Sequence, residues 1–356
     1  MKPLRSLWLA LALLACFITG GAPARAQTTA VMAVAQLRSG DAGNFARMQA
    51  LANQAKAQGA ALIVFPESSV FGWLNPAVFT QAAPIPGKYS DQFVAIAVNA
   101  GIWVAAGIEE QGPKAGPGSL PNAYQAYDSG ILINPQGRIV LHHRKFNVLQ
   151  NAFDPAACKQ ILNQDGCAYT PGNLSDITVV DTPWGKTSLL VCADAYTYAP
   201  AQALAQLKPL RPDLVIVPWG ITAGAQSQCG TDGYNATGYA AQAATYLQTA
   251  FVIGANAVGP RNYGRFLPSV YCGDSGYATP AGQSTETADP TAELALFQIG
   301  NTFDAQAGPI WNNPDAQTKC PGTCQSHATA WNGQWTTTVW GQMSVCGCQK
   351  PVFLPR

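Results

Sequence analysis

Short apolar segments that alternate with amphipathic helical segments constrain the fold of this chain most strongly. Apolar runs of about four to eight residues predict buried strands, and apolar residues at helical spacing predict helices that cover them. The expected strands cover residues 30–37, 61–66, 102–108, 130–133, 138–141, 177–180, 186–191, 213–218 and 251–255, with another pair near Gly276 and at Leu294–Ile299. The expected helices cover residues 42–58, 90–100, 199–207 and 238–249. This order predicts an α/β fold with mixed sheets and helices on the outside.

Composition excludes two broad classes of protein. Only 11% of the 356 residues are charged and 48% are hydrophobic, whereas roughly 25% charged is typical, so a disordered chain is excluded. Lys and Arg number 20 against 19 acids, and no basic run stands out. We therefore expect no nucleic-acid partner.

The first 26 residues have the pattern of a secretory signal. Lys2 and Arg5 precede an apolar stretch at residues 7–18, which is too short to span a membrane, and Ala24-Arg25-Ala26 predicts cleavage before Gln27. Removing residues 1–26 takes away three bases and no acid, which leaves a net charge of about −2. A secreted or periplasmic protein is expected, and acylation of Cys16 as a lipid anchor is the alternative.

The cysteine count predicts one free thiol. Nine cysteines lie beyond Cys16, and in an oxidising compartment an odd count leaves at least one unpaired. Cys192 is the candidate, because it ends an apolar strand while the other eight lie in loop-like surroundings. A buried, inert cysteine is the alternative there. Proximity makes a bond between Cys158 and Cys167 plausible.

The C-terminal part of the chain differs in amino-acid composition from the rest. We predict a signal peptide at residues 1–26, a main domain at 27–305 and a disulfide-rich extension at 306–356. The extension carries four cysteines, for which two disulfides are favoured over a zinc site, and four tryptophans. Asn332-Gly333 predicts a hairpin turn between two Trp-containing strands. We expect the extension to act as a structural cover, with packing on a sheet edge or binding of a partner as the alternatives.

Three reactive side chains follow predicted strands. Glu67 comes after the strand that ends in Phe65-Pro66, Lys145 follows a hairpin strand, and Cys192 follows the strand at 186–191. Strand exits are rigidly held yet open to ligands, so they favour catalytic residues. Taken singly, each residue has an ordinary structural explanation: a helix cap, a solvated lysine or a core cysteine. The neighbouring His142 and His143 point to opposite faces of a strand, so they do not form a metal site together.

Together these residues resemble the nitrilase superfamily of carbon–nitrogen hydrolases. The matching stretches are Val34-Ala35-Gln36-Leu37, Phe65-Pro66-Glu67, His143-Arg144-Lys145, residues 181–186, Leu190-Val191-Cys192-Ala193-Asp194 and Val217-Pro218-Trp219. Residues 145–148 and 153–155 are similar to the secreted biotinidase and vanin branch. The resemblance implies an α-β-β-α sandwich, commonly a homodimer, with no cofactor and no metal.

The resemblance also implies a mechanism. Glu67 acts as general base, Cys192 as nucleophile, and Lys145 with a backbone N–H stabilises the oxyanion, so that a linear amide and water give an acid and an amine through a thioester. This requires Cys192 to be a free thiol of low pKa. Nitrile hydrolysis, and a catalytically inactive extracellular binding protein on the same scaffold, are the alternatives.

One departure from the family concerns the loop after the lysine. Many members carry a second Glu there, but residues 146–154 contain none. Asp154, Glu109 and Glu110 are the candidates to replace it. The expected substrate-binding residues are Trp219, Tyr196 and Asp154, and Trp73 and Tyr198 are further aromatic candidates for an apolar pocket that takes a small amide or nitrile.

Overall fold

The fold is described from a computed structural model that covers residues 30–287, 289, 291–300 and 302–350. The predicted signal peptide, its cleavage site and Cys16 lie outside these residues. None of the described helices is long and apolar enough to cross a membrane.

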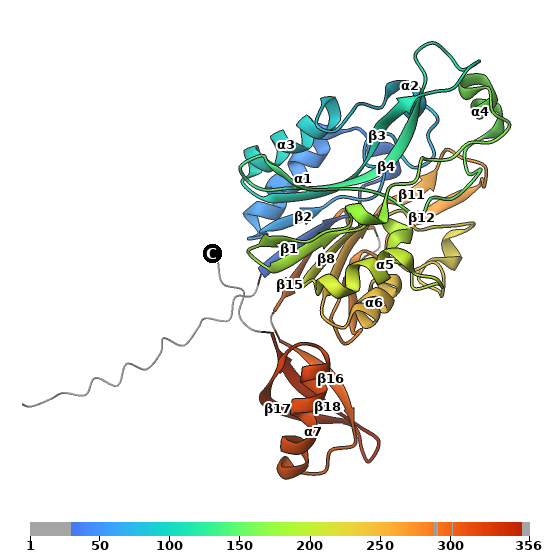
Figure 1. Cartoon of the computed structure of the whole chain (residues 1–356). Helices are drawn as coiled ribbons and strands as arrows, with labels where there is room; N and C mark the ends of the chain where they lie inside the picture. Colours follow the sequence, from blue (N-terminus) through green and yellow to red (C-terminus); the bar gives the residue numbers. More distant parts are fainter. Residues whose placement is uncertain (1–29, 288, 290, 301, 351–356) are drawn as a thin grey trace, which may run out of the picture.

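Two six-stranded sheets form the centre of the molecule (Figure 1). The first sheet has the order β15-β1-β2-β3-β4-β5, with bounds Leu294–Ile299, Ala30–Ala35, Leu62–Val64, Trp103–Lys114, Tyr124–Ile133 and Ile139–Arg144. The second has the order β14-β13-β10-β8-β7-β6, with bounds Ser284–Glu286, Gly276–Ala278, Phe251–Asn256, Leu214–Trp219, Gly185–Leu189 and Val180–Thr182. Both sheets mix parallel and antiparallel pairs, as the sequence predicts.

Helices cover the outer face of each sheet. α1 (Phe45–Ala57) and α3 (Lys88–Ala100) pack on the first sheet, and α5 (Gln202–Leu207) and α6 (Ala236–Leu247) pack on the second (Figure 1). Side chains such as Val64 and Ile216 fill the layer between the sheets. The predicted α-β-β-α sandwich is therefore confirmed. Apolar residues on both faces of its central strands explain why those strands have nearly continuous apolar sequences.

Smaller elements surround the sandwich at the ends of its strands. They are α2 (Val78–Gln81), α4 (Pro155–Leu162) and a three-stranded sheet of β11 (Val258–Arg261), β12 (Ser269–Cys272) and β9 (Thr222–Ala223). The two strands predicted near Gly276 and at Leu294–Ile299 are present as β13 and β15, and they lie in different sheets. β13 pairs with β10 in the second sheet, whereas β15 pairs antiparallel with β1 in the first. Each strand extends a different exposed sheet edge, which strand patterns along the chain do not specify.

The C-terminal extension forms a small sheet covered by one helix. Its elements are β16 (Thr302–Gly308), α7 (Asn313–Ser326), β17 (Ala330–Val339) and β18 (Met343–Gln349), with strand order β16-β18-β17. The predicted hairpin turn at Asn332-Gly333 is wrong, because both residues lie inside β17, at a break in its register with β18. The chain turns instead at residues 340–342. The predicted boundary after residue 305 falls inside β16, so we propose that this unit begins near Thr302.

Four disulfides join eight of the nine described cysteines and leave Cys192 free. The Cys158–Cys167 bond is confirmed. In the extension, Cys320 bonds to Cys346 and Cys324 to Cys348, which ties α7 to β18. The disulfides predicted there are confirmed.

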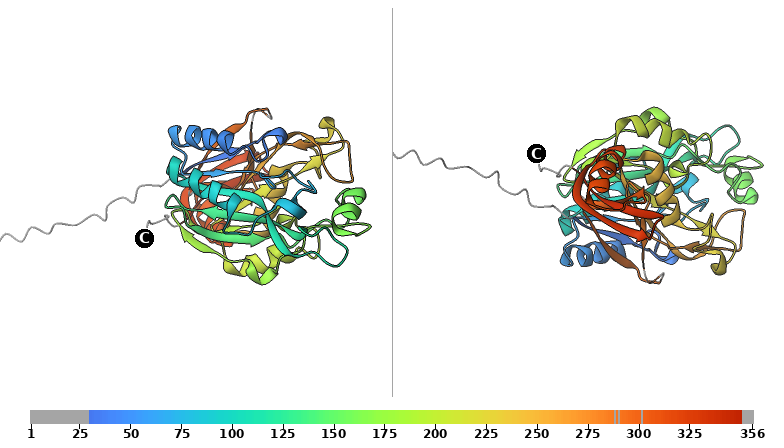
Figure 2. Two further views of the ribbon diagram at one scale, coloured as in Figure 1. Left: turned by 90° about the horizontal axis from the view of Figure 1, so that it is seen from above. Right: turned by 90° about the horizontal axis from the view of Figure 1, so that it is seen from below.

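The extension packs at the amino ends of β8 and β10. The buried ammonium of Lys350 contacts the side chain of Asp213 and the backbone oxygen of Thr249, which precede those two strands. Seen from below, the extension lies across that end of the sandwich (Figure 2). Cys192 lies at the opposite end, after the carboxyl end of β7, so the extension does not pack against it.

Candidate active site

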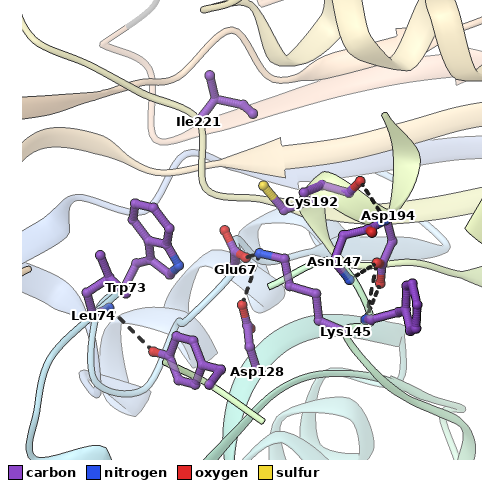
Figure 3. A network of polar contacts seen from close by, with 12 residues as sticks. Glu67, Trp73, Leu74, Asp128, Lys145, Asn147, Cys192, Asp194 and Ile221 are labelled. Atoms are coloured by element: carbon purple, nitrogen blue, oxygen red, sulfur yellow. Dashed lines mark hydrogen bonds and ion pairs between the residues drawn. The ribbon is translucent and has the colours of Figure 1, made fainter. Parts of the chain in front are cut away.

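The three reactive residues predicted from strand exits lie together in the structure. The Lys145 ammonium is ion-paired with the Glu67 carboxylate, and the Cys192 sulfur faces the same space (Figure 3). They are 3%, 4% and 5% exposed for Glu67, Lys145 and Cys192, respectively. A buried pair of opposite charges beside a thiol is able to move a proton and to stabilise a negative intermediate.

Cys192 sits in a strained backbone conformation. Its φ of 45° is in the left-handed region, and it opens a short 3-10 helix at Cys192–Ala195. Non-glycine residues take this conformation at a cost and do so preferentially at functional sites. The sharp turn lets the thiol project from the end of the second sheet towards Glu67 and Lys145, which come from the first.

A pocket of about 370 Å³ opens onto Lys145 and Cys192. Trp73, Tyr196 and Ile221 line it, and the Tyr196 hydroxyl lies 3.9 Å from the Cys192 sulfur. Among the described residues that line the pocket, Lys145 is the only charged one. Such walls favour a small, uncharged ligand.

The three residues predicted to bind substrate lie in different places relative to the pocket. Tyr196 lines the pocket, but Trp219 is buried behind it, with its ring stacked on Tyr196 at 6.5 Å between centroids. The backbone oxygen of Trp219 accepts a hydrogen bond from the Glu67 N–H, so Trp219 supports the site from behind. Asp154 does not lie at the site. Its exposed side chain caps α4 by accepting a hydrogen bond from the N–H of Ala156, a task that short polar residues at helix starts commonly have.

Asp128 is a site residue that the sequence analysis missed. It is fully buried on β4, and its Oδ2 lies 3.2 Å from the Lys145 Nζ. Its backbone oxygen also accepts a hydrogen bond from the Lys145 N–H. A carboxylate in the middle of an apolar strand was the available signal, because buried acids need a partner.

Asp194 connects the loops that carry Cys192 and Lys145. Its carboxylate accepts hydrogen bonds from the backbone N–H groups of Phe146 and Asn147 and lies 2.8 Å from the His143 Nε2. His142 points the other way, towards Glu110. The two histidines thus occupy opposite faces of β5, as predicted.

The two glutamates proposed as replacements for the missing acid also lie on opposite faces of their strand. Glu110 pairs with Arg144 and His142, away from the pocket. Glu109 is buried near Glu67, where one of its oxygens has no hydrogen-bond partner. Neither glutamate hydrogen-bonds to Lys145.

Burial and neighbouring charges together determine the protonation of Cys192 and Lys145. It raises the pKa of Cys192 to about 12, and the nearby Glu67 carboxylate raises this pKa further while Lys145 opposes the change. Burial alone would lower the pKa of Lys145, but the charges of Glu67 and its neighbours raise it well above its usual value. The expectation of a low-pKa thiol is therefore wrong: Lys145 is a cation and Cys192 a neutral thiol.

Glu109 gives a prediction on stability. Burial raises the pKa of Glu109 from its ordinary value of 4.5 to about 8, so the folded protein keeps this carboxyl group protonated at neutral pH. The unfolded chain releases the proton near pH 4.5, and the free energy of unfolding therefore falls as pH rises from 4.5 towards 8. Because glutamine stays neutral, the gain in unfolding free energy from Glu109→Gln should grow by about 2 to 3 kcal/mol between pH 5 and pH 7. Denaturant unfolding at both pH values measures this.

Glu110→Gln is the matched control. Burial raises the pKa of Glu110, but hydrogen bonds from Arg144 and His142 outweigh burial and hold this pKa at about 2. The contribution of the Glu110 carboxylate to the free energy of unfolding is complete above pH 4.5 and is lost only as pH falls towards 2. Glu110→Gln should therefore destabilise the protein equally at pH 5 and pH 7. A gain from Glu109→Gln that does not change with pH would contradict a neutral Glu109.

Comparison with known proteins identifies the family. Residues 28–300 match the family model described as carbon-nitrogen hydrolase. The chain belongs to the carbon-nitrogen hydrolase family. It is similar to a pantetheinase from Canis lupus familiaris, with 24% identity over 199 residues that cover 49% of this chain and 35% of that protein. The chain thus spans only about a third of that relative. The predicted relationship to the nitrilase superfamily is confirmed.

A solved structure supports the fold independently. An amidase from Nesterenkonia sp. superposes with a TM-score of 0.58 at 19% identity, over 76% of this chain and 90% of that one. At this identity the likeness concerns the fold.

A second family matches the C-terminal extension. Residues 313–348 match the model described as mannan-binding protein. Lectin MVL from Microcystis viridis is 39% identical over 66 residues, which cover 17% of this chain and 57% of that protein. The sequence analysis weighed partner binding for this tryptophan-rich segment but favoured a structural cover, and it named no class of ligand.

Proposed function

We propose that this protein is a secreted cysteine-dependent amidase that hydrolyses small linear amides through a thioester. The observation that carries the proposal is the buried Glu67–Lys145 ion pair beside the one free thiol among the described cysteines, with Lys145 and Cys192 lining one pocket. The four disulfides and the signal pattern at residues 1–26 support export to an oxidising compartment.

The first half of the reaction forms the thioester. As the Cys192 sulfur attacks the amide carbon, Glu67 takes the thiol proton, so that no free thiolate has to exist beforehand. Negative charge develops on the carbonyl oxygen, where the Lys145 ammonium and the backbone N–H of Ala193 stabilise it. When the C–N bond breaks, Glu67 gives its proton to the leaving amine.

The second half releases the acid. Glu67 removes a proton from a water molecule as its oxygen attacks the thioester carbon, and Lys145 again stabilises the oxyanion. The C–S bond breaks, and the sulfur recovers the proton from Glu67. The net reaction is amide plus water giving a carboxylic acid and ammonia or an amine.

The pocket favours substrates without charge. Trp73, Tyr196 and Ile221 present apolar surface, and no described lining residue other than Lys145 offers a charge to a second ionic group. A panel of neutral aliphatic and aromatic amides, pantetheine-like and biotinyl amides and the matching nitriles, assayed for released amine or ammonia, tests the proposal. Turnover of neutral amides supports it, whereas turnover of nitriles alone or of no compound favours a nitrilase or a binding protein.

The similarity of the extension to a lectin supports a second function. We propose that the extension binds a mannan-type polysaccharide. Trp340 and Trp311 are 84% and 60% exposed, and their rings meet edge to face at 6.4 Å. Large exposed aromatic side chains that lie together mark binding surfaces, because burying them from water is favourable.

Binding to immobilised mannan tests this second function. The double variant Trp311→Ala/Trp340→Ala should bind about 10-fold more weakly or worse, since truncated tryptophans at binding surfaces commonly cost this much. Phe266→Ala is the control, because Phe266 is a similarly exposed aromatic residue on the hydrolase domain. Equal binding by both variants would rule out the tryptophan pair as the site.

A further inference from the structure

Lys145 has two carboxyl partners rather than one. Its ammonium contacts Glu67, which follows β2, and the Asp128 Oδ2 on β4 at 3.2 Å. An ammonium has three N–H donors, so two are used by these partners and one is left for the carbonyl oxygen of a bound amide. Figure 3 shows the ammonium between the two carboxyl groups.

The other acids near the site are occupied elsewhere. The loop at residues 146–154 contains no glutamate, and its one acid, Asp154, caps α4 at the surface. Glu110 is paired with Arg144 and His142. An oxygen of Glu109 accepts a weak hydrogen bond from the N–H of Phe71 at 3.4 Å.

We propose that Asp128 is the positioning residue of this site and that its carboxyl group fixes the Lys145 ammonium in the place where the oxyanion forms. This inference rests on the proposed amidase function. Asp128 is fully buried and on an interior strand, so it holds Lys145 more rigidly than a residue on the following loop could.

The surroundings of Asp128 define which substitutions preserve this role. Burial raises its pKa well above the usual value, and the neighbouring Glu67 adds to this while Lys145 opposes it. Burial thus favours the neutral form of this carboxyl group, and its Oδ2 accepts from Lys145 as an amide oxygen would. Asparagine should replace it well, whereas leucine of similar size offers no acceptor.

Two measurements on the same variants test the inference. The first is kcat and KM for an amide that the wild-type protein hydrolyses. We expect Asp128→Leu and Asp128→Ala to lower kcat about 10- to 100-fold with KM changed by less than about threefold, the loss of one hydrogen bond to a charged group. Asp128→Asn should keep kcat within about threefold of wild type, and so should Asp154→Asn, the surface control.

The second measurement does not depend on amide hydrolysis. It is the rate at which iodoacetamide alkylates Cys192, because a displaced Lys145 cation no longer lowers the pKa of the thiol. Alkylation should slow at least about 10-fold in Asp128→Leu and Asp128→Ala but not in Asp128→Asn. If wild type hydrolyses no amide, the proposed function fails and alkylation alone decides the role of Asp128.

Melting temperatures show whether each variant folds. If Asp128→Leu does not fold, Asp128→Ala is compared with wild type instead. If neither variant folds, Asp128→Asn is compared with wild type. The inference is overturned if folded variants without an acceptor at position 128 match wild type in both measurements, or if Asp128→Asn is folded and as impaired as they are.

Discussion

Replacement of Cys192 with alanine is expected to lower amide hydrolysis at least about 10⁴-fold, to the level of the uncatalysed reaction with bound substrate. Cys192 is the only free thiol among the described residues and the only strong nucleophile beside Glu67. The change removes one buried sulfur, so the melting temperature should shift by only a few degrees. Amine release and thermal unfolding measure the two effects.

Cys192→Ser is the matched variant for this experiment. It keeps a hydroxyl at nearly the same position, but a hydroxyl is a much weaker nucleophile than a thiol and is harder to deprotonate. We expect serine to be almost as inactive as alanine. Hydrolysis at the wild-type rate by either variant would exclude the thioester mechanism.

The second large effect is expected from Gly220→Ala. A methyl group at Gly220 would overlap the Oε2 of Glu67, so the carboxylate would have to leave its place beside Lys145. A displacement of about 1 Å in a catalytic group commonly costs about 100-fold in rate, and we expect at least this loss in kcat. KM should change less, because Glu67 is not among the residues that line the pocket.

Gly116→Ala is the control for the glycine substitution. Gly116 lies in a loop, and an added methyl group there meets no atom within 4 Å. Its activity should match wild type. Full activity of Gly220→Ala with unchanged stability would mean that Glu67 is not held where the mechanism needs it.

The main sandwich and the three reactive residues were predictable because their signals are local. Glu67, Lys145 and Cys192 each follow an apolar run at the end of a strand, the first two in the first sheet and Cys192 in the second. The free thiol followed from the odd number of cysteines, which is a property of the whole chain. These predictions needed no knowledge of contacts between distant residues.

The remaining features depend on distant contacts. Asp128 on β4 and Lys145 directly after β5 face each other, so their contact depends on the register of the β4–β5 pair, which a buried acid in the sequence does not specify by itself. The raised pKa of Cys192 reflects burial by elements of both sheets. Asn332-Gly333 has the residues of a tight turn, but the pairing of β17 with β18 on both sides of it makes it an irregularity within a strand.

The domain arrangement connects the two proposed functions. The extension contacts the residues before β8 and β10, whereas Cys192 and Gly220 lie after β7 and β8 at the other end of the parallel strands. A polysaccharide bound by the extension would therefore leave the pocket open to small diffusing amides. The extension would serve to place the enzyme and not to contribute to its active site.

The central claim is that Glu67 activates the Cys192 thiol, and covalent labelling tests it most directly. Intact mass of the non-reduced protein is measured before and after treatment with iodoacetamide at pH 6 to 7, followed by peptide mapping, for wild type and for Glu67→Gln. The account predicts a single adduct on Cys192 in wild type that forms much more slowly in Glu67→Gln, because the thiol is neutral at rest and Glu67 takes its proton during the attack. No adduct on Cys192, or equal rates in the two proteins, would contradict it.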